Sequence, residues 1–215
     1  MRRLYQLFLT LLTLFFTVAL ISVIGITATY YFLQPQLPEI DSLKDVQLQV
    51  PLRVYTAERQ LIAEFGEKKR EPLPYDEFPR QLIQAVTAAE DENFFVHPGV
   101  DYKGILRALV NLIKTGERGQ GGSTITMQVA RNFFLSRQKT YTRKINEIFL
   151  SINIERELSK ADIMALYLNK IYLGQRAYGA AAAAKVYYGK PLHELSLDQL
   201  AMIAGLPKAP SKYNP

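Results

Sequence analysis

The stretch RQLIQAVTAAE, residues 80–90, carries an apolar stripe that ends in a carboxylate. Leu82, Val86 and Glu90 are four residues apart, so they lie on one face of a helix. Burial beside the stripe and the negative end of the helix dipole would both disfavour the charged form of Glu90. Such a carboxylate is a candidate for acid/base catalysis. The alternative interpretation is a glutamate at the edge of the stripe that reaches water.

The segments on either side of this helix indicate a mainly α fold with a small β hairpin in front. LRVYT and LIAEF have strand composition and a turn between them, which predicts a hairpin over residues 52–65. Ser159 with Asp162 three residues later is typical of a capping box at a helix start. Further helices are predicted, from their caps and apolar periodicity, over residues 101–114, 124–134, 142–158, 159–173, 177–188 and 196–204.

The N-terminal segment has the composition of a membrane anchor. Residues 4–38 contain no charge, and the apolar run exceeds the roughly 20 residues that cross a bilayer. Arg2 and Arg3 precede the run and Glu39 and Asp41 follow it, which predicts that the N-terminus is inside and the remainder outside. A cleaved signal peptide is the alternative, but its apolar region spans only ~7 to 15 residues. The sequence therefore predicts a single-pass anchor.

The charge of the chain is unevenly distributed. Between residues 103 and 144 nine basic residues stand against one acidic residue, whereas residues 39–101 hold thirteen acidic and seven basic residues. A basic segment of this kind suits anionic lipid headgroups or an anionic substrate. Nucleic acid does not suit an exported, tethered domain. There is no Cys, which excludes thiolate nucleophiles and thiolate metal sites.

The stretch GQGGSTITMQ, residues 119–128, is a glycine-rich loop that leads into a helix. It is not a P-loop, because a glycine, not a lysine, precedes Ser123. The free N–H groups of a helix N-terminus still suit an anion. Thr124, Gln128 and Arg131 would share one helical face and extend such a site. The alternative is that Ser123 or Thr124 is only an N-cap.

A second charged group follows at Arg143, Lys144 and Glu147. An ordinary surface ion pair would explain it in isolation. The chain has two His and no spacing typical of a metal site, so any metal would be a hard cation held by carboxylate and phosphate oxygens. No nucleophile-elbow or Rossmann motif is present.

Four motifs in this order resemble the peptidoglycan glycosyltransferase domain, glycosyltransferase family 51. They are EDENFFVHPG (90–99), GGSTITMQVARN (121–132), RKINE (143–147) and SKADIMALYLNKIYLG (159–174). The resemblance spans about residues 73–215. The segment in front of it is similar to the membrane-proximal part of 1A-type bifunctional class A penicillin-binding proteins.

The resemblance implies a lysozyme-like helical domain whose substrate is lipid II. Glu90 would be the general base, and Arg131, Arg143 and Lys144 would neutralise the pyrophosphate. Glu147 would position substrate, bind a metal ion or orient these cations. The other motif positions expected to contact substrate or shape the cleft are Asp91, Phe94, His97, Ser123, Thr124 and Gln128.

The same resemblance predicts the organisation and surroundings of the chain. Residues 1–33 would form a cytoplasmic tail and anchor, 34–72 a linker with the hairpin, and 73–215 a glycosyltransferase domain that continues in a longer protein. The domain would be periplasmic, on the bacterial inner membrane. No cofactor is required, and Mg²⁺ or Mn²⁺ at the pyrophosphate is the metal to consider. The expected partners are lipid II, the growing glycan, membrane lipid and other cell-wall synthesis proteins, but not nucleic acid.

Two other functions fit parts of the pattern. A lysozyme-like fold with a glutamate at a helix end also suits a lytic transglycosylase that cleaves glycan. Such an enzyme has no evident need of three cations around one site, because the glycan backbone is largely neutral. The second alternative is a non-catalytic, membrane-tethered protein that binds lipid II.

Overall fold

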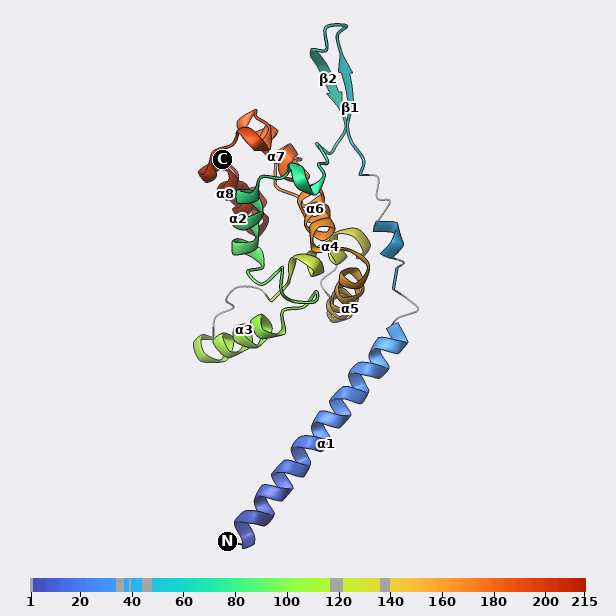
Figure 1. The fold of residues 1–215 in the computed structure, drawn as a ribbon, viewed down its shortest axis with the longest axis vertical. Helices are drawn as coiled ribbons and strands as arrows, with labels where there is room; N and C mark the ends of the chain where they lie inside the picture. Colours follow the sequence, from blue (N-terminus) through green and yellow to red (C-terminus); the bar gives the residue numbers. More distant parts are fainter. Residues whose placement is uncertain (1, 34–36, 39, 44–47, 117–121, 136–139) are drawn as a thin grey trace. The chain divides into compact units, whose positions relative to one another are not determined.

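The computed structural model describes residues 2–33, 37–38, 40–43, 48–116, 122–135 and 140–215. The chain divides into two units, Met1–Pro38 and Glu39–Pro215. The first contains helix α1 (Arg2–Leu33), drawn in blue in Figure 1. Its part Tyr5–Leu33 is long and apolar enough to cross a membrane, with a mean hydropathy of 2.6. A signal sequence satisfies the same criterion.

The second unit begins with the short helix η2 (Ile40–Leu43), followed by two strands, β1 (Leu52–Tyr55) and β2 (Leu61–Phe65). The strands are antiparallel, with Leu52 opposite Phe65, which confirms the predicted hairpin. Figure 1 shows that the hairpin stands apart from the helices, and Leu52, Ile62 and Phe65 are all largely exposed.

Helices make up most of the remainder, which confirms the mainly α prediction. The described helices are η3 (Tyr75–Glu77), α2 (Arg80–Glu90), α3 (Tyr102–Thr115), α4 (Ile125–Phe134), α5 (Tyr141–Glu157), α6 (Lys160–Lys170), α7 (Ala180–Tyr188), η4 (Leu192–Glu194), α8 (Leu197–Gly205), η5 (Leu206–Lys208) and α9 (Pro210–Tyr213).

Local capping interactions fix the ends of several helices. The Asp101 carboxylate accepts a hydrogen bond from Gly104 N at the start of α3, and Gly116 ends that helix in the left-handed region at φ 70°. The predicted capping box of Ser159 and Asp162 is present at the start of α6. These ends depend only on neighbouring residues, which is why the sequence predicted them.

The structure differs from prediction between α6 and α7. The helix predicted over residues 159–173 ends earlier than expected, at Lys170. The helix predicted over residues 177–188 begins later than expected, at Ala180. The chain between them is extended and folds back on itself, with Leu173 N bonded to Ala177 O and a bridge between Tyr172 and Tyr178. Gly179 at φ 94° permits this return, because a Cβ there would lie 2.9 Å from Asn169 O.

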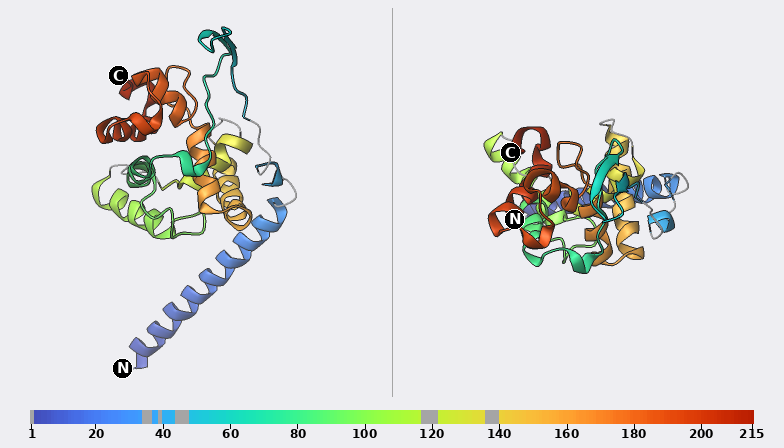
Figure 2. Two further views of the ribbon diagram at one scale, coloured as in Figure 1. Left: turned by 45° about the horizontal axis from the view of Figure 1, so that its top comes forward. Right: turned by 90° about the horizontal axis from the view of Figure 1, so that it is seen from above.

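The core lies around α4. This helix packs against α5 and α6, while α2 packs against α8. Ile125, Val129 and Ala130 of α4 are fully buried, as is Leu82 of α2. The five alanines that start α7 are also buried, which allows close helix packing; Figure 2 shows the C-terminal helices, orange to red, gathered together. The core therefore holds the end of α2 and the start of α4 in fixed positions.

Candidate active site

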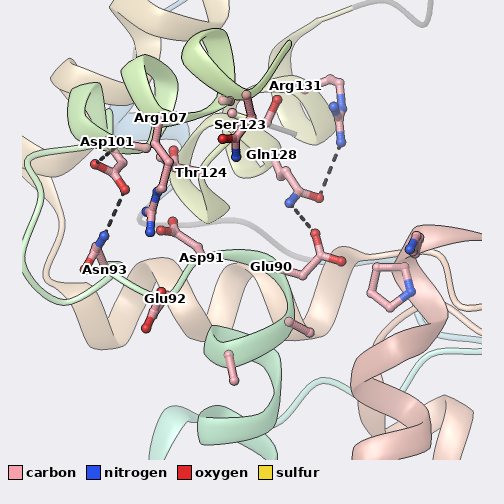
Figure 3. Close-up of a pocket in the computed structure, with 18 residues that line it drawn as sticks. Glu90, Asp91, Glu92, Asn93, Asp101, Arg107, Ser123, Thr124, Gln128 and Arg131 are labelled. Carbon is pink, nitrogen blue, oxygen red and sulfur yellow. Dashed lines mark hydrogen bonds between the residues drawn. The ribbon is translucent and has the colours of Figure 1, made fainter. Parts of the chain in front are cut away.

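A pocket of about 970 Å³ opens where the end of α2 faces the start of α4 (Figure 3). Residues from α3 and η5 complete its wall. Six of the residues predicted from the motifs line it: Glu90, Asp91, Ser123, Thr124, Gln128 and Arg131. Six further polar residues line it that the motifs did not indicate, namely Glu92, Asn93, Asp101, Arg107, Asn111 and Lys208.

Glu90 is joined to Arg131 through one amide side chain. Gln128 Nε2 donates to Glu90 Oε2 at 2.9 Å, and Arg131 Nη2 lies 3.4 Å from Gln128 Oε1 (Figure 3). Glu90 is half-buried, whereas Leu82 and Val86 of the same stripe are buried. Glu90 therefore lies at the edge of the apolar stripe, as in the alternative interpretation, and its side chain lines the pocket. A carboxylate held there can accept a proton from a bound ligand.

A buried tyrosine lies close enough to Glu90 to sense its charge. Tyr167 of α6 is 1 % exposed, and its hydroxyl has no hydrogen-bond partner in the described parts of the chain. Burial raises the pKa of Tyr167 well above its usual range, and the charge of Glu90 raises it further. The phenol therefore stays neutral and adds no charge next to Glu90.

Asp91 and His97 connect the loop after α2 to the start of α4. Gly99 N donates to His97 Nδ1, so Nε2 carries the proton and donates to the Asp91 carboxylate at 3.0 Å. Asp91 Oδ2 also accepts from Ile125 N at 2.8 Å. Both side chains are buried, and the hydrogen bonds fix the approach of Glu90 to α4.

The structure does not bring Phe94 or His97 to the pocket. Phe94 is fully buried, and Lys160 Nζ lies 4.5 Å from its ring centroid. His97 is occupied by Asp91 and Gly99. Tertiary packing uses these two side chains to support the loop that borders the pocket, so a part in shaping the cleft stays a prediction for them.

Thr124 and Ser123 have different surroundings at the start of α4. Thr124 Oγ1 donates to Gly99 O at 2.6 Å and accepts from Met127 N, so the N-cap interpretation describes this hydroxyl. Ser123 Oγ accepts from Lys144 Nζ at 2.8 Å. The glycine-rich part of the loop, residues 117–121, lies outside the described residues.

The second charged group is not a surface ion pair. Glu147 is 1 % exposed and pairs with both Arg143 and Lys144 of the same helix. Burial lowers the pKa of Lys144 to about 8, and the charges of Arg131 and Arg143 contribute. These three cations therefore lie close enough to repel one another, which the Glu147 carboxylate partly offsets. Lys144 links the group to the pocket through Ser123.

The chain is similar to known proteins over most of its length. A family model described as Transglycosylase matches residues 58–215. The chain belongs to this family. It is 54 % identical over 192 residues to penicillin-binding protein 1A of Pseudomonas aeruginosa, and 52 % identical over 191 residues to that of Escherichia coli K12. Each match covers 89 % of this chain but only 23 % and 22 % of the relative, so the chain spans under a quarter of their length.

A solved structure is also similar to this transglycosylase chain. The crystal structure of penicillin-binding protein 1A from Haemophilus influenzae shares 32 % sequence identity, with a TM-score of 0.39. The match covers 79 % of this chain and 16 % of that chain. Together with the family match, the identities confirm the resemblance that the four motifs predicted.

The described residues of the transglycosylase do not form a metal site by themselves. No group of three or more His, Asp or Glu side chains suited to a metal ion lies within the described ranges. Both oxygens of Glu147, the one predicted ligand, are paired with cations. The described residues alone therefore offer no complete donor set, and a metal ion held partly by pyrophosphate oxygens stays a prediction.

Proposed function

We propose that this chain polymerises lipid II into β-1,4-linked glycan strands and releases undecaprenyl pyrophosphate. The observation that carries the proposal is the hydrogen-bonded series from Glu90 through Gln128 to Arg131, beside the cations Arg143 and Lys144. The candidate base Glu90 and the anion-binding Arg131 thus lie on either side of the Gln128 amide. Transfer of a sugar from a pyrophosphate requires both groups.

In the proposed reaction Glu90 removes the proton from the 4-hydroxyl of the acceptor GlcNAc. The oxygen attacks the anomeric carbon of the donor MurNAc on the face opposite the pyrophosphate. The C–O bond to pyrophosphate breaks, so the α-linked donor gives a β-linked product with inversion. Arg131, Arg143 and Lys144 neutralise the charge that develops on the leaving group.

Gln128 and Glu147 act through these groups. The Gln128 amide orients Glu90 because its nitrogen donates to the carboxylate while its oxygen faces Arg131. Glu147 keeps Arg143 and Lys144 in place, since it is buried and contacts both. We assign both residues as positioning residues.

Two surfaces support a lipid-linked substrate. Helix α1 satisfies the length and composition of a membrane span, and we propose that it is retained with its N-terminus inside and the domain outside. Helix α3 exposes Tyr102, Leu106 and Ile113 and carries Lys103 and Lys114. Apolar side chains flanked by lysines suit the headgroup region of a bilayer.

The direct test is to incubate the detergent-solubilised chain with labelled lipid II and to resolve the products on a gel. A ladder of glycan polymer is expected. A parallel incubation with preformed glycan strands tests the cleavage alternative. Shortened strands without polymer from lipid II would overturn the proposal, and binding of lipid II without either product would identify a tethered binding protein.

The pKa of Lys144 predicts how the reaction responds to pH. As the pH rises through about 8, Lys144 loses its proton and the leaving group loses one neutralising charge. We expect kcat/KM for polymerisation to fall above that pH. In Lys144→Arg the fall should be absent or shifted upward, because arginine keeps its charge.

Unfolding does not explain that loss. Because the folded pKa of Lys144 is below its ordinary value of 10.5, the folded chain binds fewer protons than the unfolded chain between about 8 and 10.5. This group therefore makes the fold more stable as the pH rises through that window. If kcat/KM falls above about pH 8 in the same way in the parent and in Lys144→Arg, the role of Lys144 is contradicted.

A further inference from the structure

A second cluster of cations lies outside the pocket and has no part in the proposed reaction. Lys68 Nζ lies 5.6 Å and Arg70 Cζ 5.1 Å from the centroid of the Tyr178 ring. Lys170 ends α6, and its Nζ lies 4.3 Å from the centroid of the Phe133 ring. Burial lowers the pKa of Lys170, and the charges of Arg70 and Lys68 lower it further. We propose that Lys68, Arg70 and Lys170 form a binding site for a phosphate group.

The fold builds this cluster from distant segments. Lys69 N donates to Arg176 O, and Tyr178 N donates to Lys69 O. These two hydrogen bonds join the chain at Lys69 to the return after α6, residues 171–179. Lys68 and Arg70 both lie over the Tyr178 ring, which places the two cations together. Lys170 is added from the end of the helix that precedes the return.

The cluster lacks a compensating anion. Arg70 is 5 % exposed, and its Nε atom has no hydrogen-bond partner in the described parts of the chain. The described residues also provide no carboxylate within ion-pair distance of Lys68, Arg70 or Lys170. The nearby Glu71 pairs instead with Lys185, at 2.5 Å. A buried N–H group without a hydrogen-bond partner is unfavourable, so a bound anion that accepts from it would offset this penalty.

The number and type of the cations favour phosphate over a single carboxylate. Three positive charges match a dianion better than a monoanion, and a guanidinium fork binds phosphate oxygens in pairs. The Tyr178 ring stacks near two of the cations and leaves their N–H groups as donors. The phosphate would come from free inorganic phosphate or from a phospholipid headgroup.

The test measures thermal unfolding of the detergent-solubilised full chain by its helical circular dichroism. Phosphate is compared with chloride at equal ionic strength. Phosphate should raise the Tm of the parent by several degrees, because a ligand that binds only the folded chain stabilises it. Arg70→Gln and Lys170→Gln should each lose most of the same increment, and the double variant should lose no more than either.

Two control variants separate this site from other effects. Lys185→Gln removes an equal charge from a paired lysine and should keep the full increment. Arg131→Gln tests whether phosphate also binds in the pocket. Any decrease that it causes in the phosphate-induced rise in Tm should add to the decrease caused by Arg70→Gln. Without phosphate, Arg70→Gln should be about as stable as the parent, because it removes both the N–H group without a partner and the contact with the Tyr178 ring.

A membrane arm identifies the source of the phosphate. The same variants are compared in nanodiscs of phosphatidylglycerol and of phosphatidylcholine. If inorganic phosphate raises the Tm and the rise depends on Arg70, the site binds the free anion. If the Tm rises only in phosphatidylglycerol nanodiscs, the site binds a lipid headgroup. If Arg70→Gln keeps the full increment in both arms, the proposal is overturned. Polymerisation of lipid II does not enter this readout, so the site and the proposed reaction fail independently.

Discussion

Glu90→Gln should lower the rate of glycan polymerisation by roughly 10²- to 10⁴-fold, the usual contribution of a general base. The amide cannot accept the proton of the acceptor hydroxyl at neutral pH. It keeps an oxygen that can accept from Gln128 Nε2, so the hydrogen-bonded series and the fold should persist. The measurement is the initial rate of polymer formation from labelled lipid II, together with the Tm of each protein.

Glu92→Gln is the matched control. Glu92 follows Glu90 by two residues, lines the same pocket and is exposed, and its replacement changes the net charge equally. We expect a rate within a few-fold of the parent, since no step assigns a proton to it. If Glu90→Gln polymerises at the parental rate, Glu90 is not the base. If the two variants lose activity equally, charge in the pocket and not proton transfer is responsible.

Glu147→Gln should lower the rate of polymerisation by roughly 10²-fold, the scale of a small misplacement of catalytic groups. The amide preserves the shape of the side chain but not the charge that holds Arg143 and Lys144. The cations then repel one another without compensation, and the pyrophosphate loses part of its binding site. Binding of lipid II should weaken together with the rate.

The pH profile separates this positioning role from simple loss of structure. Without the carboxylate of Glu147 the pKa of Lys144 should fall below about 8, so the decline in kcat/KM should begin at lower pH. Glu157→Gln, an exposed glutamate on the same helix, is the control and should leave the profile unchanged. An unshifted profile in Glu147→Gln would contradict the assignment even if the rate fell.

Much of the secondary structure follows from short-range interactions and could be predicted. The starts of α3 and α6 depend on Asp101 and Ser159, which bond to atoms three residues away. The hairpin depends on two short strands and the turn between them. The return at residues 171–179 could not be predicted, because the apolar composition of that stretch also suits a helix, whereas its hydrogen bonds to Lys69 come from a distant segment.

The sequence alone determined the apolar span, the helix caps and the four motifs, because each depends on residue type and spacing within a few turns of chain. The tertiary structure decided which of those residues face the pocket. Gln128 meets Glu90 across 38 positions, and Ile125 meets Asp91 across 34. Packing between distant segments likewise decides the burial of Glu147, the support role of His97 and the position of the Arg70 guanidinium over the Tyr178 ring. Desolvation and charge interactions of this kind are properties of the folded arrangement, and the linear order of residues does not specify them.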